Sequence, residues 1–174
     1  MKRLVAAFFA PMLLATTVFA QGGEHAPQPA PEIKKLDYFA GNWHTEAEMK
    51  ASPMGAGGKY TSTDSYDWQK GNFFIVGHVE YKSAIGDGTE LTVMGYDPTK
   101  KVYTYDAFNS SGEHQTATGT LEGDTWTWSA GTDAPFKWRY IEKLTSPKSF
   151  SIRFEVSQDG STWNAIMEGK STKQ

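Results

Sequence analysis

The stretch SFSIRFEV (Ser149–Val156) alternates between polar and apolar residues without a break. Side chains on a β-strand point to opposite faces in turn, so this spacing predicts a strand with one buried and one exposed face. The same period of two recurs in TWTWS (Thr125–Ser129), in FKWRY (Phe136–Tyr140) and in TWNAIM (Thr162–Met167). The repeated pattern from Gly41 onward predicts an all-β domain.

Turn-forming residues divide this series at regular intervals. They lie at residues 69–72, 86–88, 97–100, 110–112, 122–124, 145–148 and 158–160. The segments between them give about ten strands of roughly eight to eleven residues, joined by short hairpins. No helical segment of useful length interrupts the series, which excludes parallel βαβ units. We expect an antiparallel up-and-down β-barrel, because closure removes the exposed edges of so long a sheet; a β-sandwich is the alternative.

A short helix is expected before the first strand. The segment PEIKKLDYF (Pro31–Phe39) begins with a proline and an acidic residue, and its apolar residues recur every three positions from Ile33 onward. This spacing predicts a helix with one apolar face, which we expect to cover one end of the domain. Residues 21–31 are rich in Gly, Ala and Pro and are expected to form a disordered linker. The barrel domain is thus expected to span residues 32–174.

The N-terminus has the three parts of a secretory signal peptide. Lys2 and Arg3 provide the positive start, and residues 4–18 form the apolar run. The sequence VFA (Val18–Ala20) then gives a cleavage site, which predicts that residues 1–20 are removed. The apolar run of about 15 residues is shorter than the ~20 that span a bilayer, so no stable membrane anchor is expected after cleavage. We therefore expect an exported protein, either periplasmic or extracellular.

Composition excludes several classes of function. The 174-residue chain has no cysteine, which excludes thiol chemistry, iron–sulfur clusters, thiolate zinc sites and bacterial lipidation. Its net charge of −3 comes from interspersed charges of both signs, and without a basic stripe we expect no nucleic-acid partner. Aromatic residues make up 14% of the chain, a high fraction that has to be accommodated either in a packed core or around a ligand.

The start of the first strand resembles a known superfamily. A short apolar helix followed by GNW (Gly41–Trp43) is similar to the Gly-x-Trp signature of lipocalins and their calycin relatives. Together with GYDP (Gly95–Pro98), which opens a turn, the pattern resembles a family of secreted bacterial lipocalin-like domains of unknown function. The resemblance implies a barrel with Trp43 packed at its closed end and a small apolar molecule bound inside. Nitrobindin-like relatives bind haem through a histidine on a late strand, but the last third of this chain has no histidine, so we expect no haem and no other cofactor.

Aromatic side chains are the candidate ligand-binding residues. Alternation places Trp126 with Trp128, and Trp138 with Tyr140, on common faces of their strands. Facing inward, these rings would either fill the barrel or line a cavity, and both interpretations stay open. The full candidate set is Tyr60, Tyr66, Trp68, Trp126, Trp128, Trp138 and Tyr140. The Gly-rich segment Ala51–Gly58 between the first two strands is expected to be a flexible loop that acts as a lid over the open end.

No catalytic motif is present: the sequence has no nucleophile elbow, no Cys–His pair and no metalloprotease helix. The preferred hypothesis is therefore non-enzymatic binding of a small apolar or aromatic molecule. One alternative is a packed barrel that acts as an interaction module of the cell envelope. The other is a small hydrolase or isomerase that uses an interior acid such as Asp64, which shares a strand face with Tyr66 and Trp68.

Metal binding is not expected. His44, His78 and His114 are on three different strands of the predicted barrel. His44 is adjacent to Trp43 and so faces the opposite side of its strand, which is the outside when Trp43 plugs the base of the barrel. Three convergent imidazoles would suit a divalent metal, but this arrangement argues against convergence.

Overall fold

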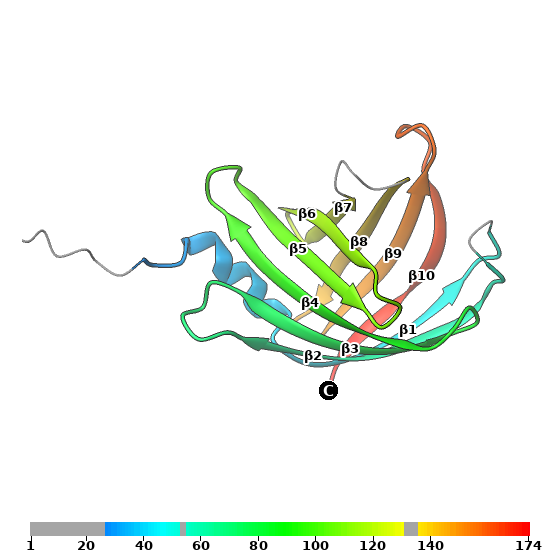
Figure 1. Ribbon diagram of the computed structural model, residues 1–174, viewed down its shortest axis with the longest axis horizontal. Coiled ribbons are helices and arrows are strands. Elements are labelled where there is room, and N and C mark those ends of the chain that lie inside the picture. The colour runs from blue at the N-terminus through cyan, green and yellow to red at the C-terminus, as the bar shows by residue number, and fades with distance from the viewer. Residues whose placement is uncertain (1–26, 53–54, 131–135) are drawn as a thin grey trace, which may run out of the picture.

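The computed structural model describes residues 27–52, 55–130 and 136–174. Within them the chain forms one short helix, η1, and ten strands (Figure 1). The predicted signal peptide, residues 1–20, lies outside the described residues, as do residues 21–26 of the predicted linker and residues 53–54 of the predicted loop. In the described part of the chain, no helix is long and apolar enough to cross a membrane.

The strands follow one another in chain order around a closed barrel. They are β1 (Gly41–Met49), β2 (Gly58–Trp68), β3 (Ile75–Ser83), β4 (Gly88–Asp97), β5 (Val102–Asn109), β6 (His114–Glu122), β7 (Thr125–Ala130), β8 (Lys137–Ser146), β9 (Ser149–Ser157) and β10 (Asn164–Lys173). Each strand pairs antiparallel with its neighbours in the sequence, and β1 pairs with β10, which closes the sheet. The predicted up-and-down barrel is therefore confirmed, and the alternative β-sandwich is wrong.

Alternation decides which side chains face the interior. On β9, Phe150 and Ile152 are buried while Ser151 and Arg153 are exposed, as the pattern SFSIRFEV predicts. The hairpin between β2 and β3 lies at a predicted turn, where Asn72 takes a φ of 57°. Asparagine adopts this left-handed conformation more readily than most residues, which explains why the strand pattern stops there.

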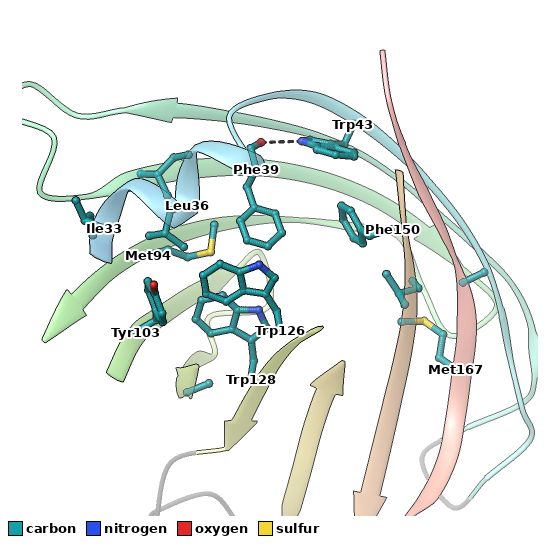
Figure 2. Close-up of a cluster of buried hydrophobic side chains, with 14 residues drawn as sticks. Ile33, Leu36, Phe39, Trp43, Met94, Tyr103, Trp126, Trp128, Phe150 and Met167 are labelled. Atoms are coloured by element: carbon teal, nitrogen blue, oxygen red, sulfur yellow. Dashed lines mark hydrogen bonds between the residues drawn. The ribbon is translucent and has the colours of Figure 1, made fainter. Parts of the chain in front are cut away.

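The helix η1 (Pro31–Tyr38) is a 3-10 helix in the segment predicted to be helical. Pro31 suits its first turn because proline has no N–H that would lack a partner. Ile33 and Leu36 are its buried residues, and Phe39, which follows the helix, is buried as well. Because a 3-10 helix has three residues per turn, this spacing aligns the three side chains on one face. Figure 2 shows that Leu36 and Phe39 point from the helix toward the aromatic core.

The hydrophobic core fills the end of the barrel next to η1. Trp43 is 1% exposed, and its indole Nε1 donates a 2.7 Å hydrogen bond to the carbonyl oxygen of Phe39, drawn as a dashed line in Figure 2. The ring centroids of Trp43 and Phe150 lie 4.9 Å apart, and those of Phe39 and Trp126 lie 5.5 Å apart. A buried indole needs a partner for its N–H, and here the end of the helix supplies it. The interpretation of Trp43 as a plug at the closed end is confirmed.

Side chains of the barrel wall hold η1 in place. The Tyr103 hydroxyl on β5 donates to the carbonyl oxygen of Glu32 at 3.0 Å, and the Trp68 Nε1 on β2 donates to Asp37 Oδ1 at 2.7 Å. The Tyr38 hydroxyl lies 2.8 Å from carbonyl oxygens at the β8–β9 turn. The helix therefore closes one end of the barrel. Because successive strands reverse direction, β1, β3, β5, β7 and β9 end at the opposite, open end.

Candidate functional site

A cavity of about 200 Å³ lies inside the barrel, above the closed-end core. Phe39, Met94 and Phe150 belong to that core and also line the cavity, so they form its floor. Toward the open end the cavity reaches Tyr60, which is half-buried, and Gln115, which is exposed. Each of the ten strands contributes at least one lining residue. The cavity is thus the space that the inward faces of the strands leave unfilled.

Five of the seven aromatic residues predicted from the sequence line this cavity: Tyr60, Tyr66, Trp128, Trp138 and Tyr140. The other two lie at the closed end. Trp126 is fully buried, stacks on Trp128 at 5.5 Å and meets Tyr103 edge-on at 4.6 Å. Trp68 uses its indole N–H on Asp37 of η1. Both residues share a face with cavity-lining neighbours but sit one step closer to the closed end of their strands, so they belong to the plug.

Three carboxyl groups also line the cavity: Asp64 on β2, Glu90 on β4 and Glu142 on β8. Asp64 pairs with Val79 on β3, and Val79 pairs with Glu90, so these two acids lie in one row across the wall. Their backbones are two strand spacings apart, on the order of 10 Å. Glu142 comes from the far wall, four strands from β2 around the closed sheet. The acids therefore face the same space from separate positions.

Asp64 lies inside the barrel, as the alternative of an interior acid on the face of Tyr66 and Trp68 requires. It is 8% exposed, and its Oδ1 is buried without a hydrogen-bond partner within the described chain. Burial raises the pKa of Asp64 to about 6; hydrogen bonding with Ser62 opposes the increase, and repulsion from Glu90 adds to it. At pH 7 this carboxyl group is therefore mostly ionised in a largely apolar space.

Glu142 is equally buried but has a donor. The Nε1 of Trp128 donates a 2.9 Å hydrogen bond to Glu142 Oε2. Burial raises the pKa of Glu142 to about 7, the hydrogen bond from Trp128 opposes this, and the charge of Asp64 raises it further. Glu142 therefore changes protonation state near neutral pH.

Glu90 lies nearer the open end and is held by a tyrosine. The Tyr105 hydroxyl donates to Glu90 Oε1 at 2.9 Å. Burial raises the pKa of Glu90, and this hydrogen bond lowers it in part. Burial also raises the pKa values of Tyr66, Tyr105 and Tyr140, so these phenols stay neutral and can act as hydrogen-bond donors in the cavity.

Sequence reasoning identified Asp64 but missed Glu90 and Glu142. The signal was present in the alternation. Glu142 continues the inward series of Trp138 and Tyr140 on β8. Glu90 precedes two buried residues of its own face at positions 92 and 94. Charged residues are rarely buried, so a glutamate at the end of an inward-facing series usually indicates that the buried part of the strand has ended. For this reason the period of two alone did not identify Glu90 and Glu142 as cavity residues.

The three histidines that the structure describes, His44, His78 and His114, lie outside the cavity. His78 is exposed, and the Nε2 of His114 lies 2.9 Å from Asp106 Oδ1 on the outer surface. His44 lines a shallow outer groove together with Glu80, in agreement with its predicted outward orientation. Among the residues that the structure describes, no group of three or more His, Cys, Asp or Glu side chains could hold a metal ion.

The cavity combines aromatic walls with a small number of polar groups, which is the usual character of a small-molecule site. Its carboxyl groups can accept hydrogen bonds from a ligand, and its phenols can donate them. A carboxyl group whose pKa lies near 7 can also take up or release a proton at physiological pH. Both binding and proton transfer are chemically available to this arrangement.

The model of one protein family, DUF1579, described as a protein of unknown function, matches residues 28–173. The chain belongs to the DUF1579 family. The match begins just before η1 and ends with the last residue of β10, so the DUF1579 domain is the entire barrel together with its helix. The cavity and its three acids lie wholly within this domain. No curated protein is significantly similar to the chain in sequence.

Two solved structures resemble the DUF1579 barrel. The crystal structure of Rv2717c from M. tuberculosis has a TM-score of 0.58 and 13% identity, over 84% of this chain and 99% of that one. The S-type phycobiliprotein lyase CPES from Guillardia theta has a TM-score of 0.52 and 10% identity, over 80% of this chain and 89% of that one. At such low identities the similarity concerns the fold alone.

Proposed function

We propose that this DUF1579 protein binds a small, partly apolar molecule inside its barrel without catalysing a reaction on it. The observation that carries this proposal is the cavity of about 200 Å³ that begins at the closed-end core and reaches exposed Gln115. A barrel with a fully packed interior would leave no such space. The alternative of a packed interaction module predicts a filled interior, and the structure differs from that prediction.

The size and lining of the cavity define the class of molecule. An apolar cavity of about 150 Å³ is large enough to hold benzene. The cavity of about 200 Å³ therefore suits a ligand of one ring with a short chain. Trp128, Trp138 and Tyr140 offer aromatic faces to such a body, and the carboxyl and phenol groups offer fixed polar contacts.

The resemblance to lipocalin-like calycins supports this proposal. The Gly-x-Trp motif at Gly41–Trp43 lies directly after a helix that caps the barrel, as in that superfamily. We infer that the DUF1579 barrel is a calycin relative that has kept its open end for a ligand.

We also propose that the protein is exported and acts in the periplasm or outside the cell. The support is the sequence of residues 1–20, with its positive start, apolar run and cleavage site. Intact-mass measurement of the protein from its native host should give a chain that begins at Gln21. A cytoplasmic chain that keeps Met1 or residues 2–20 would contradict this proposal.

Binding can be tested with a cavity-filling variant and a matched control. Val79 lines the cavity, whereas Val76 lies on the opposite face of the same strand, β3. Calorimetric titration with 2-phenylethanol, phenylacetate and 2-phenylethylamine should give saturable 1:1 binding of at least one compound to the wild type. Val79→Phe should weaken it at least tenfold, and Val76→Phe should leave it unchanged. Absence of saturable binding by all three compounds, or unchanged binding to Val79→Phe, would overturn the proposal.

A second candidate function is proton transfer. The observation that favours it is the presence of two buried carboxyl groups whose pKa values are about 6 and about 7, for Asp64 and Glu142, in one cavity. Such groups are suited to general acid–base catalysis at neutral pH. Deuterium exchange at the α-carbon of acetophenone, followed by NMR, should then be accelerated by the wild type and lost in Glu142→Gln. Exchange at the uncatalysed rate would leave binding as the function.

A further inference from the structure

The polar part of the cavity carries charge of one sign. Asp64, Glu90 and Glu142 line it, and among the described residues that line it none is Lys, Arg or His. Buried carboxylates in proteins are normally paired with a cation or fully hydrogen-bonded, because their transfer from water is costly. The closed-end core offers no such partner, since it consists of apolar and aromatic side chains. The compensating charge is missing from the cavity wall.

The three acids differ in how well they are satisfied. Glu90 receives a hydrogen bond from Tyr105, and Glu142 receives one from Trp128. Asp64 is 8% exposed and its Oδ1, buried in the wall of the cavity, has no donor within the described chain. Hydrogen bonds with Ser62 and Thr45 lower the pKa of the Asp64 carboxyl group, so it is Oδ1 alone that lacks a donor. Buried polar atoms are normally hydrogen-bonded, and a donor that enters the cavity would satisfy this oxygen.

We propose that the ligand is an organic cation, a small amine whose ammonium group donates to Asp64 and whose apolar body lies against the aromatic wall. This inference rests on the proposed binding function and names the chemical class of its ligand. An ammonium group has three donors and no acceptor, which matches a site rich in acceptors. Glu142 and Glu90 then supply further negative charge on the far wall and near the open end.

The aromatic wall also favours a cation. The faces of Trp and Tyr rings attract a positive charge within about 6 Å, most strongly when the pair is removed from water. Tyr66 is two residues from Asp64 on the same face of β2, and Tyr140 is two residues from Glu142 on the same face of β8. Each of these acids therefore has an aromatic neighbour on its own strand that borders the same cavity. A ring-bearing amine satisfies both features at once.

The protonation equilibria of the acids point the same way. Burial raises the pKa values of Asp64, Glu90 and Glu142. The charge of Glu90 raises the pKa of Asp64 further, and the charge of Asp64 raises that of Glu142 further. A bound ammonium would remove both penalties, because it compensates the charge and donates hydrogen bonds. A metal ion would compensate the charge too, but no group of metal ligands is assembled among the described residues. An amine on an apolar body fits the observed arrangement better.

The test uses ligands of matched shape and different charge. The mature wild-type protein is titrated calorimetrically at pH 7.5 with 2-phenylethylamine, which is cationic, with 2-phenylethanol, which is neutral, and with phenylacetate, which is anionic. We expect the amine to bind at least tenfold more tightly than the alcohol and the acid to bind most weakly. Because the three compounds share one ring and a short chain, a difference between them reports on charge.

Variants then assign the charge to a residue. Asp64→Asn keeps the shape of the side chain and should weaken binding of the amine at least tenfold, and binding of the neutral alcohol by much less. Asp67→Asn is the matched control, because Asp67 is exposed on the same strand, three residues away. It should leave both affinities unchanged, and thermal melting should show that both variants are folded.

The outcomes separate the two proposals. Tighter binding of the alcohol or of the acid, or equal binding of all three compounds, would overturn the cationic ligand while upholding a binding cavity. Amine binding that Asp64→Asn leaves intact would overturn the assigned role of Asp64 and, with it, this inference. Absence of binding by all three compounds would overturn the proposed function and this inference together.

Discussion

The indole Nε1 of Trp128 donates to the carboxylate of Glu142, and the two residues come from adjacent strands on the inner face of the barrel. Trp128 is 4% exposed and Glu142 is 8% exposed, so this hydrogen bond is largely shielded from water. It fixes the direction of an acid whose pKa burial raises to about 7. The wall of the cavity thus holds a titratable group in a defined position.

Replacing Glu142 with Gln should stabilise the protein at alkaline pH. A glutamate has a pKa of about 4.3 in an unfolded chain, against about 7 for Glu142 in the fold. Between these values the folded state binds more protons, so the free energy of unfolding decreases as the pH rises. We expect the free energy of unfolding of Glu142→Gln to exceed that of the wild type by on the order of 2 kcal/mol at pH 8 and by little at pH 4.5. Urea unfolding at both pH values measures this difference.

The control for that measurement is an exposed glutamate. Glu122 lies at the end of β6 and is exposed, so Glu122→Gln should not reproduce the pH-dependent gain. A Glu142→Gln protein that is less stable than the wild type at pH 8 would show that the hydrogen bond from Trp128 matters more than the burial of the charge.

Removing the indole donor should have the opposite effect. Trp128→Phe takes away the hydrogen bond that offsets the burial of Glu142, and hydrogen bonds to charged groups contribute about 1.5–3 kcal/mol. We expect a loss of about 2 kcal/mol at pH 8 and a smaller loss at pH 4.5, where Glu142 is protonated. A double-mutant cycle with Glu142→Gln should give a larger coupling energy at pH 8 than at pH 4.5. Equal coupling at both pH values would contradict a charge-assisted bond.

Gly119 provides the space behind Trp128. A Cβ placed at Gly119 would lie 2.5 Å from Cε3 and Cζ3 of the Trp128 ring, closer than real contacts allow. Gly119→Ala should therefore push the ring into the cavity, at a cost of about 1–3 kcal/mol, and weaken ligand binding at least tenfold. Thermal melting and calorimetric titration measure the two effects. Thr118→Ala, at the exposed neighbouring position, should change neither.

The outer surface contains an acid of the opposite kind. Glu155 is 4% exposed and accepts hydrogen bonds from Arg139 and Arg153. Burial alone would raise its pKa, but the hydrogen bonds from the two arginines lower it. A lowered pKa gives stability that is present above the unfolded value and is lost as the pH falls. Glu155→Gln should thus cost on the order of 1 kcal/mol at pH 7, because its arginine partners are partly exposed to water. The cost should decrease toward pH 3, as measured by urea unfolding, and a constant difference would contradict the ion pairs.

Amine binding should depend on pH through the cavity acids. The titratable groups that act on Asp64 and Glu142 from inside the barrel are Glu90 and the phenols of Tyr60, Tyr66, Tyr105 and Tyr140, which burial keeps neutral. His44, on the other face of the wall, lowers the pKa of Asp64. An ammonium favours the ionised carboxylates, so binding lowers their pKa values and releases protons. We expect affinity to rise from pH 5 to pH 8. Calorimetry at pH 6 in two buffers of different ionisation enthalpy counts the protons, and no release would argue against an ionic contact.

The period of two was sufficient to predict the barrel, but it does not show how far along the barrel axis an inward-facing residue lies. Trp126 and Trp128 share a face of β7, and the sequence treats them alike. The structure separates them, because η1 and Phe39 fill the closed end up to Trp126 and stop there. Depth along a strand depends on where the helix packs, which involves contacts between segments almost a hundred residues apart.

The acids show a second limit of sequence reasoning. Asp64 could be predicted because it lies between aromatic residues of one face, whereas Glu90 and Glu142 resemble ordinary surface residues until the register is known. Whether the interior is filled also depends on how the inward side chains of ten strands meet. Alternation along one strand contains no information about the side chains opposite it, so the cavity and its charge become visible only in three dimensions.

Because η1 closes one end, the barrel encloses a pocket and does not form a channel through the protein. The helix and the aromatic rings beneath it occupy this end. A ligand would therefore have to enter and leave the cavity through the opposite end. Under the proposed binding function, association and dissociation would therefore share one opening, so a change that narrows it should slow both rates together.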